Sequence, residues 1–132
     1  MIEPPTSLRG LARAYAAGEL SPVAVVDACL DRIARLDGAL GAFQVVYAEE
    51  ARAAARAAEQ AIASGHRIGP FHGVPFALKD IVDVAGRITT GGSKAYAARV
   101  SPATATIARR LLAAGGVLVG KTRTVEFAFG GW

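Results

Sequence analysis

Lysine is scarce in this sequence, with three lysines against twelve arginines. Arginine therefore supplies most of the positive charge, and its guanidinium group does not give up its proton in proteins. A buried lysine ammonium, in contrast, has a lowered pKa and can become a base. The few lysines are thus the positions at which we look for chemistry.

Cysteine is scarcer still, since Cys29 is the only one, so no disulfide can form within the chain and we expect a reducing compartment. The two histidines and this cysteine stand at unrelated spacings, and we predict neither a metal site nor a cofactor. No apolar run approaches the roughly 18 residues that span a bilayer, and the opening residues lack the apolar core of a secretion signal. We therefore expect a cytoplasmic protein without a membrane partner.

The charge and the apolar content of the 132 residues limit the possible partners. The net charge is +4, but the arginines are scattered without a block of like charge, so we predict no direct contact with nucleic acid. The hydrophobic content of 52% indicates either a well-filled core or a surface that expects a partner, and we favour the second interpretation.

Three helices are predicted in the first half of the chain. Ser7 and Ser21 can act as N-caps, Pro22 suits a first helical position, and a glycine follows each apolar stripe. We expect the second helix to end at Gly38. The third is rich in alanine, which has the highest helix propensity. The predicted helices cover residues 8–17, 22–38 and 48–64.

The character of the sequence changes at Gly69. Short apolar runs without a helical period are typical of buried strands, and they alternate here with a polar glycine loop and one further helix. This order predicts an α/β fold in which N-terminal helices precede a β-α-β unit with parallel strands. The expected elements are a strand at 74–78, a loop at 86–93, a helix at 103–114 and a strand at 117–119. We divide the chain into a helical part, 1–68, and an α/β part, 69–132.

Lys79 closes the first of these apolar runs, inside the stretch GVPFALKDIVDVAGRITTGGS of residues 73–93. A buried strand ahead of the lysine would remove its amine from water and favour the neutral form. We therefore expect chemistry at Lys79, which in this chain taken alone would lie close to a surface.

A phosphate-loop pattern, G-x-x-x-x-G-K-[ST], is matched by Gly115, Gly120, Lys121 and Thr122. In a true phosphate loop the intervening residues form a turn between a strand and a helix. Here they are Gly-Val-Leu-Val, which is typical of a strand. We predict no nucleotide binding and expect Lys121 to pair with a carboxylate or a strand-end carbonyl.

His72, Asp80 and Ser93 supply the residue types of a serine-hydrolase triad. No G-x-S-x-G motif accompanies them, and any chain of this length contains such residues by chance. We expect His72 to be a loop residue that is hydrogen-bonded to the backbone, and His66 to be solvated.

Taken together, GAFQVV, the stretch around Lys79 and the tail AAGGVLVGKTRTVEFAFGG resemble the opening part of an amidase-signature family enzyme. The resemblance covers nearly all of the chain and implies the helix-flanked mixed sheet of that fold. Three positions depart from the family pattern: Ile81 and Arg123 stand where asparagine is common, and Thr104 where aspartate is common. The most specific matching positions are Gly73, Pro75, Lys79, Asp80, Gly86, Thr89, Thr90, Gly92, Ser93, Gly120, Lys121, Thr122, Glu126, Phe127, Ala128 and Gly130.

This resemblance implies a Ser-cisSer-Lys triad that cleaves carbon–nitrogen bonds of small-molecule amides, with Lys79 as the lysine. It also implies that Phe127, Ala128 and Gly130 line the pocket for the acyl group. The family's GGSSGG segment, with its bridging serine, and the later segment with the nucleophile are not found in these residues.

We therefore interpret the chain as an incomplete amidase-signature domain that is inactive alone and needs a C-terminal portion or self-associates. Its apolar residues Val74, Phe76 and Leu78 would then be partly exposed. Two other readings stay open. One is the glutamine-hydrolysing subunit of a tRNA-dependent amidotransferase, and the other is a non-catalytic binding or scaffold protein.

Overall fold

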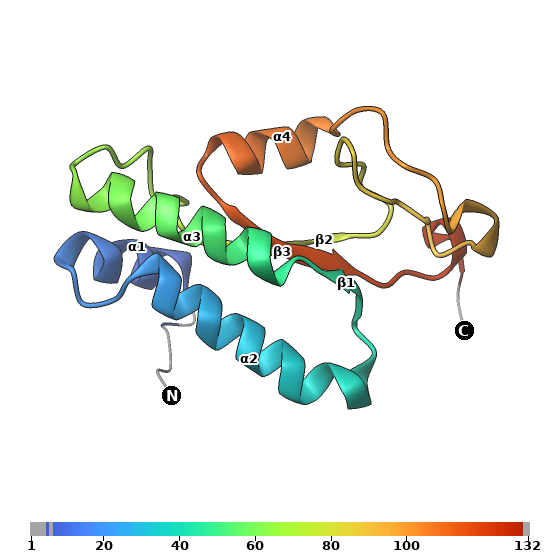
Figure 1. The fold of residues 1–132 in the computed structure, drawn as a ribbon, viewed down its shortest axis with the longest axis horizontal. Coiled ribbons are helices and arrows are strands. Elements are labelled where there is room, and N and C mark those ends of the chain that lie inside the picture. Colours follow the sequence, from blue (N-terminus) through green and yellow to red (C-terminus); the bar gives the residue numbers. More distant parts are fainter. Residues whose placement is uncertain (1–4, 6, 131–132) are drawn as a thin grey trace.

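The computed structural model describes residue 5 and residues 7–130. The start of the expected range 1–68 and the end of the expected range 69–132 therefore lie outside the described residues. In the described residues, two helices, a short strand and a third helix come first, and two further strands with a fourth helix between them follow (Figure 1). The helices are α1 (Leu8–Ala17), α2 (Pro22–Leu40), α3 (Ala48–Ala63) and α4 (Thr106–Ala113). The strands are β1 (Phe43–Val46), β2 (Pro75–Lys79) and β3 (Val117–Thr122), and short 3-10 helices lie at Lys94–Tyr96 and Glu126–Ala128.

The predicted N-caps are confirmed. The side chain of Ser7 accepts a hydrogen bond from Gly10 N, and that of Ser21 accepts one from Ala24 N. Each bond satisfies an N–H group that has no partner inside the helix. Gly18 ends α1 with a φ of 70°, a left-handed conformation that suits glycine.

The predicted end of α2 at Gly38 is wrong, because the helix continues to Leu40 and is capped by Gly41. A helical glycine costs only about 1 kcal/mol relative to alanine, which neighbouring contacts can offset. Here Asp37 Oδ1 accepts hydrogen bonds from Ala42 N at 2.7 Å and Phe43 N at 3.0 Å. The helix therefore ends at Leu40, where Gly41 caps it and Asp37 bonds the backbone N–H groups that follow.

Helix α3 packs against both α2 and β3 through alanine. Ala51 and Ala55 are buried in one cluster with Val26 and Leu30 of α2 and with Val117 and Val119 of β3. Small side chains on α3 let these elements approach closely, so the alanine-rich composition serves packing as well as helix propensity.

The sheet has the order β1-β3-β2, with β2 parallel and β1 antiparallel to β3. The predicted β-α-β unit is confirmed, since α4 connects the parallel pair. Strand β1 was not predicted. It is only four residues long and its two central side chains are exposed, so it lacks the apolar alternation that marks a half-buried strand.

Helix α4 covers the opposite face of the sheet from α2 and α3. Leu118 packs with Leu78 of β2 and Ala108 of α4, whereas its neighbours Val117 and Val119 join the α2–α3 cluster. Successive strand residues point to opposite faces, so the two clusters lie on the two sides of β3.

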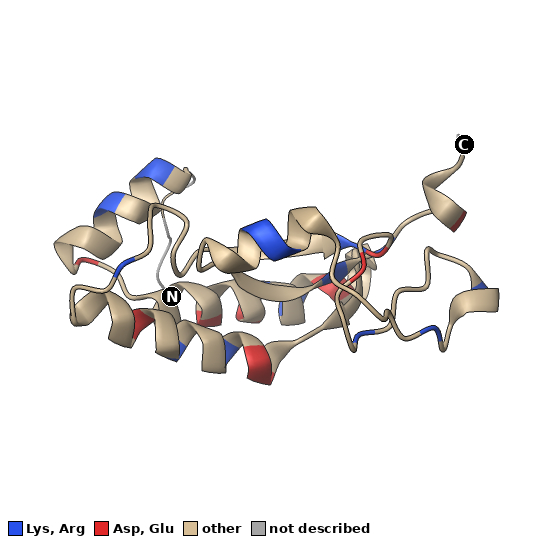
Figure 2. Ribbon diagram, turned by 90° about the horizontal axis from the view of Figure 1, so that it is seen from above, with Lys and Arg blue, Asp and Glu red and all other residues tan. Residues whose placement is uncertain are grey.

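The expected exposure of the apolar residues near Lys79 is wrong for Val74 and Leu78, which are buried, while Phe76 is half-buried. Helix α4 and the N-terminal helices already supply the neighbours that these side chains need. Among the described residues, no helix is both long and apolar enough to cross a bilayer. Basic and acidic positions are interspersed over the helices and the loop end of the molecule (Figure 2).

Candidate active site at the ends of strands β2 and β3

Lys79 is the last residue of β2, and its Cα lies in register with Thr122 of β3. Its side chain is exposed, in line with the expectation that Lys79 lies close to a surface in this chain. Leu78 faces the core beneath α4, and strand alternation turns Lys79 to the other face at the last position of β2. The structure thus presents this amine at the strand end, where a substrate can reach it.

The buried lysine is instead Lys121, whose side chain is fully inaccessible to solvent. Its Nζ lies 2.9 Å from Asp80 Oδ1 and donates hydrogen bonds to the Ile88 carbonyl at 3.1 Å and to Thr89 Oγ1. Asp80 is almost as deeply buried, and in the described part of the chain this ion pair is the only polar contact of its Oδ1. Neither charge can be removed alone without leaving the other uncompensated.

Asp80 also holds the residue that precedes it. Its backbone N–H donates to the Thr122 carbonyl, and its carbonyl accepts from Gly91 N, both at 2.9 Å. Its Oδ2 accepts hydrogen bonds from the backbone N–H and the hydroxyl group of Thr90. The position after Lys79 is therefore fixed from β3 and from the glycine loop together, which holds the backbone at the end of β2.

A second polar cluster extends this network along the same loop. Thr89 Oγ1 lies 2.8 Å from Ser101 Oγ, and Ser101 donates to Asp83 Oδ1 at 2.8 Å. Asp83 receives two further bonds from the guanidinium of Arg99, at 2.8 and 2.9 Å. These bonds from Arg99, followed by that from Ser101, hold the pKa of Asp83 well below its usual range. The loop is thus fixed by buried and partly buried polar contacts.

The phosphate-loop match has the geometry of a strand, as predicted. Val117–Thr122 is β3, and Gly120 carries no side chain because a Cβ there would lie 2.4 Å from the Val45 carbonyl of β1. The predicted pairing of Lys121 with a carboxylate is confirmed by Asp80, while its carbonyl partner, Ile88, lies in the loop after β2 and not at a strand end. Gly120 therefore allows β1 and β3 to approach closely, and Lys121 joins β3 to the loop after β2.

His72, Asp80 and Ser93 do not form a triad. His72 lies before β2, where its Nδ1 accepts a hydrogen bond from Ile68 N, and Asp80 lies after the other end of the same strand. Burial, followed by the charge of Arg67, lowers the pKa of His72. The expectation of a backbone-bonded loop histidine is confirmed, and His66 is exposed as expected.

Phe127 and Ala128 have positive φ values of 52° and 55°, which are uncommon for residues other than glycine. Phe127 N donates to the Gly91 carbonyl at 2.6 Å, and its ring meets Tyr96 edge-on with centroids 5.6 Å apart. The segment that was expected to line an acyl pocket therefore lies on the loop that Asp80 holds. Its contact with substrate stays a prediction, as does that of Gly130.

A cavity of about 360 Å³ opens between this loop and the Phe127 ring. Sequence reasoning missed Tyr96 and Arg99, because neither belongs to a motif with a chemical signature. The cavity is lined by Ile81, Asp83, Thr89, Gly91, Tyr96, Arg99 and Phe127.

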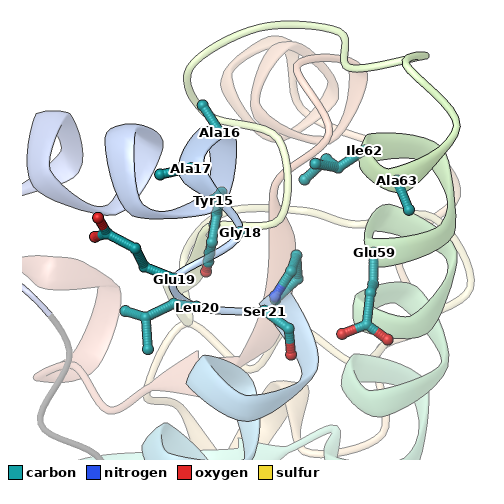
Figure 3. A pocket seen from close by; sticks show the side chains of 11 residues that line it. Tyr15, Ala16, Ala17, Gly18, Glu19, Leu20, Ser21, Glu59, Ile62 and Ala63 are labelled. Atoms are coloured by element: carbon teal, nitrogen blue, oxygen red, sulfur yellow. The ribbon is translucent and has the colours of Figure 1, made fainter.

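A separate pocket of about 480 Å³ lies between the α1–α2 turn and the C-terminal end of α3 (Figure 3). Glu19 and Glu59 are its charged lining residues, and Tyr15 lies at its wall. It shares no residue with the loop around Lys79. Across the described ranges, no group of three or more potential metal ligands comes together.

Comparison with known proteins agrees with this geometry. The model of the family described as Amidase matches residues 24–131. The A subunit of the Glutamyl-tRNA(Gln) amidotransferase of Acidothermus cellulolyticus is 46% identical over 120 residues, and its counterpart from Chloroflexus aurantiacus is 43% identical over 117. These alignments cover 91% and 89% of this chain but 24% of each relative, so the chain spans about a quarter of the length of the curated relatives it matches.

Solved structures give the same result. The native peptide amidase from Stenotrophomonas maltophilia superposes with a TM-score of 0.86 at 34% identity, over 92% of this chain and 25% of that one. A bacterial aryl acylamidase of the amidase signature family superposes with a TM-score of 0.85 at 27% identity, over 92% and 26%. The fold, the fixed strand end and the sequence match agree, and the chain belongs to the amidase family.

Proposed function

We propose that this chain supplies the lysine of a Ser-cisSer-Lys site that cleaves carbon–nitrogen amide bonds. The observation that carries the proposal is the contrast at the end of β2. Lys79 is exposed, while the next residue, Asp80, is almost completely buried and its carboxylate contacts Thr90 and Lys121. Such an arrangement holds the backbone from which Lys79 projects and leaves its Nζ accessible, as a general base requires.

In this proposal the unprotonated amine of Lys79 accepts a proton from a bridging serine, which in turn takes the proton of a nucleophilic serine. The nucleophile's Oγ forms a bond to the amide carbonyl carbon, the C–N bond breaks, and the relay returns a proton to the leaving amine. Water or a second amine then cleaves the acyl-enzyme. Phe127, Ala128 and Gly130 would line the acyl side of the substrate.

Neither the GGSSGG segment nor the later nucleophile segment occurs in these residues, so we expect the 132-residue chain to show no turnover of a simple aryl amide. Removing triad members leaves only binding and oxyanion effects. The assay is release of the coloured amine by purified chain. Turnover that disappears in Lys79→Ala would contradict this expectation.

The role of Lys79 can be tested by joining this chain to the segment that follows the matched region in the Stenotrophomonas maltophilia peptide amidase. We expect Lys79→Ala and Lys79→Arg both to lower kcat by about 10²–10⁴-fold, because arginine keeps the charge but cannot act as a base. Arg109→Ala, an exposed position on α4, is the matched control and should leave kcat unchanged.

A Lys79→Arg protein that keeps activity within about tenfold of the parent would contradict a base at this position. A fused protein that folds with a cooperative melt yet shows no activity with any amide would favour the non-catalytic binding or scaffold reading.

A second candidate is the glutamine-hydrolysing subunit of a tRNA-dependent amidotransferase. It is favoured by the 43–47% identity to Glutamyl-tRNA(Gln) amidotransferase A subunits, which exceeds the 34% identity to the peptide amidase. Joining the chain to the following segment of the Acidothermus cellulolyticus relative, and comparing glutamine with a peptide amide as substrate, separates the two candidates. A higher kcat/KM for glutamine selects the amidotransferase, and a higher value for the peptide amide selects the amidase.

A further inference from the structure

A pocket of about 340 Å³ lies beside the strand end that carries Lys79, and its lining is cationic. Two of its residues, Lys94 and Arg123, are positively charged, and most of the others carry a hydroxyl or amide group. Of the described residues that line it, none is acidic. The lining consists of Gln44, Thr90, Gly92, Ser93, Lys94, Ala97, Arg123 and Thr124.

One wall is built on β3. Arg123 directly follows Thr122, the register partner of Lys79, so the pocket and the candidate base share one edge of the sheet. Its backbone N–H donates to the Ala42 carbonyl at 2.8 Å, and its Nε donates to the Phe43 carbonyl at 3.1 Å. The Nε bond uses one of five guanidinium donors and orients the planar fork.

The other wall is the end of the glycine loop. Gly92 has a φ of 74°, and a Cβ there would lie 2.6 Å from the Thr124 carbonyl, so the two walls are in backbone contact. Ser93 and Lys94, which follow Gly92, line the same pocket as Arg123. Ser93 is buried, and its Oγ accepts a hydrogen bond from Ala95 N, which leaves its hydroxyl proton as a donor toward a ligand.

The two cations have no compensating charge in the described part of the chain. Neither Lys94 nor Arg123 forms an ion pair with a carboxylate there, and the nearby Asp80 is already paired with Lys121. Two like charges around one cavity repel each other, and an anion between them relieves that repulsion while accepting from the guanidinium and the hydroxyl groups.

We propose that this pocket binds a compact oxyanion, a carboxylate or a phosphate group. The next step rests on the proposed function. If that function holds, the anion is a carboxylate carried by the amide substrate, because the pocket adjoins Lys79. The Arg123 fork then selects acidic amides over neutral ones.

The test is a titration of the isolated chain at low ionic strength with inorganic phosphate and, separately, with glutarate, followed by backbone amide NMR shifts. We expect saturable shifts centred on residues 92–94 and 123–124, at least tenfold weaker in Arg123→Asn and in Lys94→Gln. Both positions are exposed, so these variants should fold, and a thermal melt checks this. Arg109→Gln, which removes one exposed positive charge from α4, should bind like the parent.

Saturation by glutarate supports a carboxylate ligand, and saturation by phosphate alone supports a phosphate ligand. No saturable shift with either anion, or equal weakening by Arg109→Gln, overturns the proposal. The titration needs no turnover, so an inactive fused protein would refute the proposed function while leaving the anion site intact, and the reverse result would refute only the anion site.

Discussion

The helical region, residues 8–63, and the loop after β2, residues 80–101, are held by different kinds of contact. Helices α1 to α3 are fixed by apolar side chains, such as Val26, Leu30 and Ala55, which pack on each other and on β3. The loop is fixed by polar groups that are buried with their partners. Apart from His72, the buried polar residues lie in this loop or bond to it: Asp80, Thr89, Thr90, Ser93, Ser101 and Lys121.

This difference has consequences for how each region responds to change. Apolar packing is non-directional, so a lost contact costs roughly in proportion to the area and cavity involved. A buried polar network is directional, and removing one member leaves its partners unsatisfied. The candidate base and the proposed anion pocket both adjoin the polar region, where a fixed geometry is most useful.

The sharpest test of this contrast is Lys121→Met. Methionine fits an apolar site but leaves the Asp80 carboxylate buried without its cation, and we expect a loss of about 3–5 kcal/mol in the free energy of unfolding. The measurement is urea denaturation followed by circular dichroism.

The double variant Lys121→Met/Asp80→Asn removes the orphaned charge and keeps a side chain that can bond Thr90. It should recover a large part of the loss, because the penalty arises from the unpaired carboxylate. Equal instability of the single and double variants would show that the pair contributes through packing alone.

The matching test in the helical region is Leu30→Ala. Leu30 is 5% exposed in the α2–α3–β3 cluster, and we expect a loss of about 2–4 kcal/mol from transfer and cavity formation. No titrating group is involved, so this loss should be the same at pH 5 and pH 8 in urea melts. A loss that changes between the two pH values would mean that the two regions are coupled more tightly than their contacts indicate.

The same contrast explains how much could be predicted from the sequence. The helices, their N-caps and the β-α-β order depend on local propensity and on apolar period, both of which are written in consecutive residues. The end of α2 and strand β1 were missed because they depend on contacts made elsewhere, from Asp37 Oδ1 and across from β3.

The candidate site was predicted in part. Asp80, Thr89 and Thr90 belong to the motif that carried the resemblance, and the pairing of Lys121 was expected, but the partner Asp80 was not named. The position of Lys79 near a surface was expected, but the complete burial of Lys121 was not predicted. Which residue at a strand end faces solvent depends on the neighbouring helix, here α4, and a single apolar run does not reveal it.

The hydroxyl of Tyr15 is a buried polar group in the helical region, and it donates to the Gly73 carbonyl at 3.2 Å. Tyr15→Phe leaves that carbonyl without this donor and should cost about 1–2 kcal/mol near pH 8. Burial raises the pKa of Tyr15 to about 12, above its unfolded value near 10. The stability linked to this group is therefore present below pH 10 and is lost as the pH rises toward 12. Urea melts at pH 8 and pH 11 should show the difference between parent and variant shrinking by about 1 kcal/mol, and a constant difference would refute the assignment.

The smallest expected effect concerns Asp83, and it places the acid sensitivity in the loop. Bonds from Arg99 hold the folded-state pKa of Asp83 below its unfolded value, so the stabilisation is present above about pH 4 and is lost as the pH falls through the folded-state pKa. Both side chains are about one third exposed, so solvent screens the pair, and Asp83→Asn should cost no more than about 1 kcal/mol at pH 7. Parent and variant should therefore converge in urea melts between pH 4 and pH 2. Glu49→Gln, which removes an exposed carboxylate on α3, is the control and should leave the acid limb unchanged. If the difference in the free energy of unfolding between parent and Asp83→Asn is undiminished at pH 2, Asp83 contributes through packing and not through its charge. Another carboxylate must then cause the acid sensitivity.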